Sequence, residues 1–325
     1  MKTYHIKRYT ATDYKQWNDF VQQAKNATFL FHRDFMEYHK DRFEDYSLMV
    51  YEGTKLVAVL PANRVGEVVH SHQGLSYGGL VYGESLKLAS VIAVFQKILF
   101  FLNENTVSKI NLKLIPSIYH NKPAEELQYA LFLVNAKLIR RDSLSVVDLV
   151  KNISISKDRK NNIKKGKRND LVIKEEVSFD LFWNEVLIPN LEVKHNSKPV
   201  HSITEISYLK SIFPNNIRQF NVYKGNQIIA GTTIFTSENV AHSQYISKNN
   251  LDKNYRSLDF LHAHLLFNVF RGVRFFDFGI SNEMQGRKLN EGLSYWKESF
   301  GASTIAHDFY EVKTSDFYLL ENIFV

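Results

Sequence analysis

Two ionisable residues near the carboxyl end of the sequence have types and surroundings that could support acid–base chemistry. Asp277 lies among aromatic residues in 273–279, whose alternation is typical of a strand. Lys297 follows in 289–300, which has the apolar spacing of a helix and ends at Gly301. A strand that carries an acid, followed by a helix that carries a cation, can build a polar pocket inside an apolar body.

An acid and a cation brought together in this way could supply a base and stabilise a developing oxyanion. No covalent enzyme intermediate is required, so the absence of cysteine is no obstacle. If Asp277 faces a cleft, burial would raise its pKa and suit it to act as the base. The carboxylate could instead pair with a cation such as Arg274 or Arg287. Glu283, just beyond the strand, is the alternative acid, unless it is only a solvated loop residue.

Other histidines and tyrosines offer weaker candidates. His242 and Tyr245 lie on a predicted strand, and Tyr245 could protonate a leaving thiolate or simply pack in the core. His70 and His72 have the one-face spacing of a strand, but no third ligand accompanies them, so we expect no metal site.

The elements that must position these residues occur twice along the chain. Each half has a strand hairpin, a strand, a helix, a strand, a second helix and a closing strand. In the first half the helix is expected over 86–103, the second helix has an apolar stripe from Leu127 to Leu138, and the closing strand is 145–149. In the second half the first helix is expected over 258–271, with Ser257 as its N-cap, and the other elements are the strand 273–279, the helix around 289–300 and the closing strand 305–310. We therefore predict an α/β protein with mixed sheets and two tandem domains, 1–150 and 151–325.

A basic helix is predicted at the start of the second domain, over 157–168. It contains seven basic residues against one acid, Ser156 can cap it, and Gly166 should weaken it by about 1 kcal/mol. Poor apolar spacing predicts that most of its surface is exposed. Lys164 and Arg168 could bind phosphates of a nucleotide-linked substrate or of tRNA, or the helix could be no more than a solvated charged surface.

The string Gly292-Leu293-Ser294-Tyr295-Trp296-Lys297-Glu298-Ser299-Phe300-Gly301, with the doubled element order, resembles the FemAB-like members of the GNAT acyltransferase superfamily. Segments 29–36, 41–43, 60–63 and 72–79 are similar to the first half of such proteins. The resemblance implies two GNAT-like domains. It also implies that Lys297 contacts the acyl donor or stabilises charge at its carbonyl. The alternative is a surface lysine beside Glu298.

The resemblance also suggests where an acceptor would bind. Arg33, His72 and Tyr77 match positions in the similar segments of the first half, and we expect them at a cleft between the domains, where they could bind a phosphate or a sugar. The alternative is that all three are structural core residues.

One departure from the GNAT pattern concerns the donor. GNAT enzymes usually have a glycine-rich pyrophosphate loop before the helix of the second domain, whereas the corresponding segment here, 247–257, has no glycine. Free amides at the helix N-terminus could still bind phosphate, with help from Arg256 and Ser257. FemAB-like proteins often lack this loop, so the departure leaves the resemblance standing.

Composition limits the setting. The chain has 325 residues and a net charge of +7, which favours anionic partners. Without cysteine the sequence fits a reducing compartment. The most apolar run, 86–102, contains charged residues and is short for a bilayer span, and the N-terminus lacks a signal-peptide pattern. We expect a cytoplasmic protein without a membrane span; its oligomeric state cannot be read from the sequence.

The resemblance leads to three functional hypotheses. The favoured one is transfer of an acyl group, with acetyl-CoA as cosubstrate and no tightly bound cofactor, to an amine of an amino sugar or sugar nucleotide in surface polysaccharide biosynthesis. The second is an aminoacyl-tRNA-dependent transferase that acts on a peptidoglycan precursor. The third is a non-catalytic ligand-binding protein of the same fold.

Overall fold

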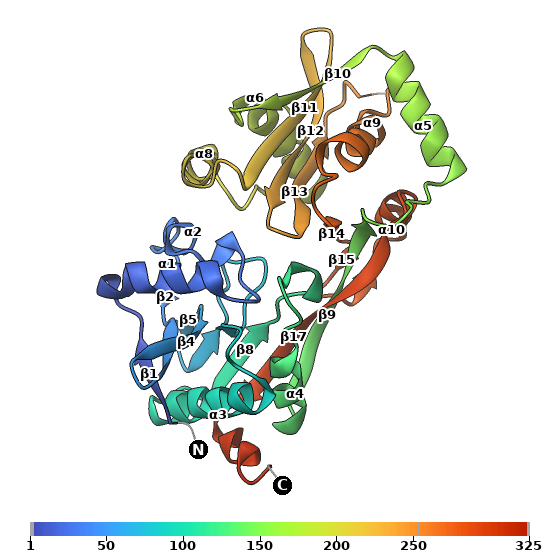
Figure 1. Cartoon of the computed structure of the whole chain (residues 1–325). Coiled ribbons are helices and arrows are strands. Elements are labelled where there is room, and N and C mark those ends of the chain that lie inside the picture. Colours follow the sequence, from blue (N-terminus) through green and yellow to red (C-terminus); the bar gives the residue numbers. More distant parts are fainter. Residues whose placement is uncertain (1–2, 253, 324–325) are drawn as a thin grey trace. The chain divides into compact units, whose positions relative to one another are not determined.

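A computed structural model describes residues 3–252 and 254–323 of the chain (Figure 1). The chain forms two compact units. Unit 1 contains residues 1–142 and 306–325, and unit 2 contains residues 143–305. Each unit has its own buried apolar core.

Unit 1 has two groups of strands. One sheet has the order β1-β3-β4-β7, and the other group has the order β17-β8-β6-β5-β2. The helices α3 and α4 contribute most of the helical side chains of the core, and α3 contacts both α4 and β1. The elements are β1 Tyr4–Arg8, α1 Tyr14–Gln23, α2 Arg33–Glu37, β2 Glu44–Asp45, β3 Leu48–Glu52, β4 Lys55–Leu60, β5 Asn63–Val65, β6 Val68–His70, β7 Val81–Tyr82, α3 Leu88–Glu104, β8 Lys109–Lys113 and α4 Glu126–Leu133.

Unit 2 is built on the strand order β10-β11-β12-β13-β14-β9. β10 to β13 are antiparallel neighbours, whereas β13 and β14 are parallel, and α9 connects them and packs on β12 and β13 (Figure 1). The elements are α5 Lys157–Arg168, β10 Leu171–Glu176, α6 Asp180–Phe182, α7 Ile188–His195, α8 Ile203–Ile212, β11 Ile217–Lys224, β12 Gln227–Thr236, β13 Val240–Lys248, α9 Ser257–His264, β14 Phe275–Ile280, β15 Asn282–Glu283, β16 Lys288–Leu289 and α10 Glu291–Glu298.

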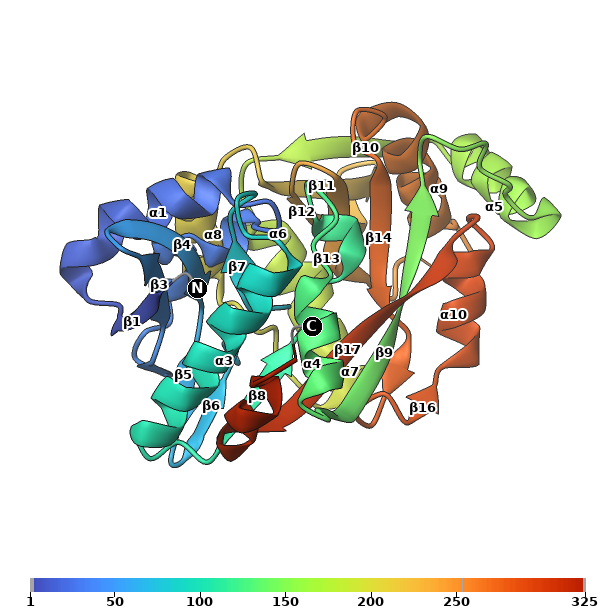
Figure 2. The same cartoon turned by 60° about the horizontal axis from the view of Figure 1, so that its bottom comes forward.

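The closing strands of the two halves are exchanged between the units. β9 (Lys137–Asp148) begins in unit 1, but its second half pairs with β14 of unit 2. β17 (Ser303–Lys313) begins in unit 2, but its second half pairs with β8 of unit 1. Figure 2 shows these two long strands, which are longer than the expected 145–149 and 305–310. The exchange explains why the units do not follow the expected ranges 1–150 and 151–325.

Two helices differ from their predicted extents. The stripe that predicted a helix as far as Leu138 breaks earlier, because α4 ends at Leu133 and Asn135 has a left-handed φ of 53°. In unit 2, α9 ends at His264 and continues as one π-helical turn, Leu265–Val269. The predicted N-cap Ser257 is the first residue of the helix, and Arg256 precedes it with φ 61°.

The basic helix α5 has the predicted bounds, 157–168, and Ser156 accepts a hydrogen bond from the backbone N–H of Arg159 at 3.2 Å. One face of the helix is not solvated. Gly166 is buried against α9, and a Cβ atom at this position would lie 2.6 Å from the Cβ of Phe260. The glycine is therefore required by the close approach of the two helices.

A buried ionic contact joins three helices of unit 2. Arg159 of α5 is 6% exposed and forms an ion pair with Asp259 of α9. The indole N–H of Trp296, on α10, donates to the same carboxylate at 2.8 Å. Asp259 thus connects α5, α9 and α10, and it fixes the helix that carries Lys297.

Candidate active site

The candidate site of unit 2 lies along the parallel strands β13 and β14. Their register places His242 opposite Asp277. Parallel strands need a crossover helix, here α9, and ligands in α/β proteins bind where such strands end. Beyond this point the pairing of β14 with β9 is irregular between Asp277 and Ile280.

The carboxylate of Asp277 is 1% exposed and has two hydrogen-bond donors on it. The backbone N–H of Gly279 donates to Oδ1 at 2.7 Å, and Nδ1 of His242 lies 3.0 Å from Oδ2. An ionised carboxylate only accepts hydrogen bonds, so Nδ1 of His242 carries the proton and Nε2 is left with a lone pair. Since the His242 side chain is 19% exposed, the pair can present a base to a substrate.

Lys297 is buried, with 2% of the residue exposed. Its Nζ donates to the carbonyl oxygens of Gly279 at 3.0 Å and Ile280 at 2.6 Å. Burial lowers its pKa to about 8, and the nearby charge of Asp277 opposes that shift. The ammonium form therefore prevails at neutral pH, and two carbonyls take two of its three N–H groups, so the third can donate to a substrate oxygen.

Gly279 is the common centre of these groups. Its N–H binds Asp277, its carbonyl binds Lys297, and a Cβ atom at its position would lie 3.4 Å from Cε1 of His242. Its φ of +73° belongs to the left-handed region, which a side chain rarely adopts. The bend at this glycine brings an acid–histidine pair and a buried ammonium to one strand end.

The structure decides between alternatives that the sequence left open. Lys297 is not a surface lysine, and Asp277 is buried with His242 as a hydrogen-bond partner. Sequence reasoning placed His242 on the strand without assigning it a role. The sequence position of His242 could have indicated a role, because His242 lies on the strand before the crossover helix and Asp277 lies on the strand after that helix.

The other two candidates for catalysis have different partners. Tyr245 lies further along β13, where its hydroxyl is 2.6 Å from Nδ1 of His201 and accepts the backbone N–H of the same residue at 3.2 Å. Glu283 lies on the exposed hairpin strand β15 and accepts a hydrogen bond from the side chain of Asn290 at 3.1 Å. These hydrogen bonds go to residues other than the groups around Gly279.

The start of α9, where a pyrophosphate was expected, already holds a carboxylate. Asp252 is 2% exposed, accepts the backbone N–H of Ser257 at 3.3 Å and pairs with Lys248 at 2.9 Å. The carboxylate occupies the positive end of the helix and would repel a second anion. The amide of Ser257 is therefore engaged, whereas the side chain of Arg256 is exposed.

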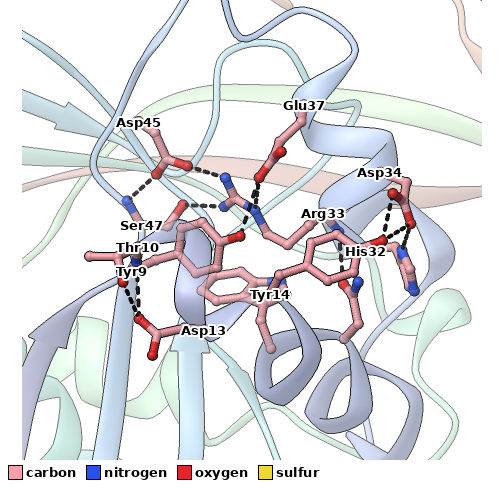
Figure 3. Close-up of polar contacts among 12 residues, drawn as sticks. Tyr9, Thr10, Asp13, Tyr14, His32, Arg33, Asp34, Glu37, Asp45 and Ser47 are labelled. Carbon is pink, nitrogen blue, oxygen red and sulfur yellow. Dashed lines mark hydrogen bonds and ion pairs between the residues drawn. The ribbon is translucent and has the colours of Figure 1, made fainter.

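In unit 1, Arg33 is fully engaged by its own unit. It is 3% exposed, and its guanidinium lies between the carboxylates of Glu37 and Asp45 and over the ring of Tyr9 (Figure 3). The Nε atom donates to Glu37 at 2.9 Å. A guanidinium held in this way is a core arginine, and we correct the expectation that it binds an acceptor phosphate.

The other residues expected to bind substrate lie in two settings. His72 and Tyr77 are buried in the loop after β6, and the hydroxyl of Tyr77 donates to Thr28 at 3.0 Å. Lys164 and Arg168 are exposed on α5. The face of α5 that packs on the rest of unit 2 contains Arg159, which pairs with Asp259. The sequence analysis did not identify this role.

Across the described residues, no group of three or more His, Asp or Glu side chains is placed to hold a metal ion. The described helices also include none with the length and apolar character that a membrane span requires.

Several solved structures share the fold. FemX superposes with a TM-score of 0.68 at 10% identity, covering 98% of this chain and 99% of that one. A C-terminal domain (DUF2156) from Agrobacterium fabrum, assigned to a lysylphosphatidylglycerol synthetase, gives 0.63 at 15% identity and covers 95% and 94%. A tandem GNAT protein from the clavulanic acid biosynthesis pathway gives 0.53 at 11% identity and covers 96% and 99%. No protein-family model matches the sequence, and no curated protein does.

These similarities confirm the fold class predicted from the sequence. The chain is a mixed α/β protein with the tandem GNAT fold of FemX and its structural relatives. At this level of identity the likeness extends to the fold alone.

Proposed function

We propose that the protein is an acyltransferase that moves an acyl group from an activated donor to an amine. The observation that carries the proposal is the convergence of His242, Asp277 and Lys297 on Gly279. A base, a group that orients the base and a buried hydrogen-bond donor are what this reaction asks of a protein.

In the proposed reaction, Nε2 of His242 takes a proton from the attacking amine while the new N–C bond forms. Asp277 stabilises the resulting imidazolium through Nδ1–H. Lys297 donates its third N–H to the carbonyl oxygen, which becomes an oxyanion. The intermediate collapses when the bond from the acyl carbon to the donor oxygen or sulfur breaks, and His242 returns the proton to that leaving atom.

The donor we favour is aminoacyl-tRNA rather than acetyl-CoA. Asp252 places a negative charge at the start of α9, which disfavours a pyrophosphate there. The exposed cations of α5, Lys164 and Arg168 among them, favour a polyanion. An amine on a peptidoglycan precursor is the corresponding acceptor. The acetyl transfer to an amino sugar that the resemblance suggested is the competing assignment.

A donor comparison tests the proposal. The purified protein would receive either labelled acetyl-CoA or tRNA charged with labelled amino acids, with a peptidoglycan precursor and an amino-sugar nucleotide as acceptors. We expect label to leave tRNA only. Transfer from acetyl-CoA alone would reverse the donor assignment, and calorimetric binding of ligands without any product would indicate a non-catalytic binding protein.

A charge-matched pair of variants separates tRNA binding from chemistry. Lys164→Gln with Arg168→Gln should weaken use of tRNA and reduce its salt dependence. Lys55→Gln with Lys137→Gln removes the same charge from exposed positions in unit 1 and should leave activity unchanged. An equal loss in both double variants would show a general charge effect and remove α5 from the donor site.

A further inference from the structure

A cavity lies within unit 1, at the end of its own parallel strand pair. β6 and β8 are parallel, with His70 opposite Asn111, and the cavity opens just beyond this pair. Its volume is about 70 Å³, enough for a group of a few heavy atoms. It is lined by the polar side chains of His70, His72, Asn111 and Lys113 and by the apolar side chains of Ile139 and Phe309.

Two polar atoms of this lining have no protein partner. The residue His72 is 4% exposed, and its Nδ1 atom is buried without a hydrogen-bond partner among the described residues. The Oδ1 atom of Asn111 is also buried and has no hydrogen-bond partner within the described part of the chain. Leaving such an atom unsatisfied costs about 1–3 kcal/mol, and a ligand group or an ordered water in the cavity would offset this cost.

Lys113 supplies a cation to the lining of the cavity. Its Nζ donates to the backbone carbonyl of Leu75, and it forms no ion pair within the described residues. Two acids of the surrounding strands have other cations as ion-pair partners. Asp142 accepts three hydrogen bonds from Arg140, two of 3.0 Å and one of 2.7 Å. Glu311, opposite Asn111 across the sheet, pairs with Lys109 at 3.2 Å.

His72 also has an unusual backbone. Its φ of 62° lies in the left-handed region, which is uncommon for residues other than glycine. Strained backbone of this kind gathers at ligand sites, where the surrounding structure holds it. The imidazole packs against the rings of His39 and Phe43, and the residue lines the cavity together with Lys113.

We propose that this cavity binds a short-chain carboxylate, independently of the acyl transfer in unit 2. Lys113 donates to one carboxylate oxygen, and His72, in its Nδ1–H tautomer, donates to the other. Asn111 accepts an N–H or O–H of the ligand where it has one. Ile139 and Phe309 cover the short stem.

The charge balance favours a carboxylate over a phosphate. One ammonium matches one negative charge, whereas a phosphate brings nearly two. Asp142 is close enough to influence Lys113 electrostatically and would repel the second charge. The apolar wall of the cavity also suits a hydrocarbon stem better than a fully hydrated ion.

The test uses propionate as the probe and the ring signals of His72 as the readout. In NMR titrations of the full chain with labelled histidine, propionate should shift the His72 signals in a saturable way, and His72→Asn, which tolerates positive φ, assigns them. Propionamide, which has the same shape without the charge, should not. Saturation by inorganic phosphate but not by propionate would overturn the ligand class, and saturation by neither would overturn the site.

Two lysine variants identify the cation. Lys113→Met keeps the stem and should weaken propionate binding by at least about tenfold. Lys109→Met removes a lysine of the same strand outside the cavity and should bind propionate normally. Equal binding by both variants would contradict the assignment of Lys113.

A pH titration of the unaltered chain decides the matter if Lys113→Met does not fold. Burial and Arg140 lower the pKa of Lys113 to about 8, against the opposing effect of Asp142. Burial also lowers the pKa of His70 and that of His72, so both stay neutral from about pH 7 upward. Propionate affinity should therefore fall about tenfold between about pH 7 and about pH 9. A constant affinity would show that Lys113 is not the cation.

Discussion

His242 and Asp277 lie directly opposite each other on parallel strands, with Nδ1 of the imidazole 3.0 Å from Oδ2 of the carboxylate. The residues are far apart in sequence, and the crossover through α9 sets their register. The carboxylate of Asp277 fixes the tautomer of His242 and orients its imidazole as a base. The buried ammonium of Lys297 then meets the same strand end through Gly279.

The first prediction concerns the base. His242→Gln removes the proton acceptor and should lower kcat for acyl transfer by about 10²–10⁴-fold, because general base catalysis contributes rate factors of that size. Asp277→Asn should also lower kcat, since an amide cannot stabilise the imidazolium. Steady-state kinetics with the proposed donor measure both effects.

A control variant checks that the loss is specific. His264→Gln changes a half-buried histidine on α9 whose contact is Asn268, and it should retain full activity. The thermal unfolding midpoint of each variant reports whether the fold survives. Full activity of folded His242→Gln would exclude this residue as the base.

The second prediction concerns Lys297. Lys297→Met should lower kcat by about 10²–10³-fold with a small change in KM, as expected for loss of one oxyanion donor. Activity of the unaltered protein should decline as pH rises through about 8, where burial places the pKa of this lysine. Lys288→Met, at an exposed position on β16, is the matched control. A variant that raises KM alone would assign Lys297 to ground-state binding instead.

The sequence predicted the individual helices and strands better than it predicted which strands pair with each other. α5 has its predicted bounds because Ser156 caps it and its residues favour a helix. The exchange of β9 and β17 was not predictable, because both strands have the same kind of alternation and only tertiary packing decides their neighbours. The pairing of His242 with Asp277 was not predictable for the same reason, because neither strand's sequence determines the register of a parallel pair.

Gly166 is a single residue for which the sequence predicts the wrong effect of a substitution. Helix propensity predicts that a glycine inside α5 weakens the helix, so alanine should stabilise it. The structure places Phe260 2.6 Å from where the new Cβ would lie. Packing therefore reverses the sign of the prediction.

The third prediction follows from that reversal. Gly166→Ala should destabilise the protein by about 1–3 kcal/mol in urea unfolding, the usual cost of overpacking. Gly272→Ala, where no atom lies within 4 Å of the added Cβ, should change stability little. Trp296, joined to α5 through Asp259, provides the fluorescence signal. A stabilised Gly166→Ala would mean that α5 and α9 are not packed as described.

The fourth prediction concerns acid stability and His262. This residue is fully buried among the rings of Phe276, Phe278, Trp296 and Phe300. Burial lowers its pKa to about 4 from the ordinary value of 6.5. The unfolded chain therefore binds the proton more readily, so the stabilising contribution is complete above about pH 6.5 and is lost as the pH falls towards 4.

The size of the effect makes the residue testable. At about pH 5 the lost free energy of unfolding should be about 2 kcal/mol from this histidine alone. His262→Phe, which suits the aromatic surroundings, should remove that part of the loss between about pH 7 and about pH 5. His5→Gln, at an exposed position, should leave the pH dependence unchanged. Because carboxylates titrate at lower pH, an unaltered pH dependence in His262→Phe would show that the buried imidazole does not control acid unfolding.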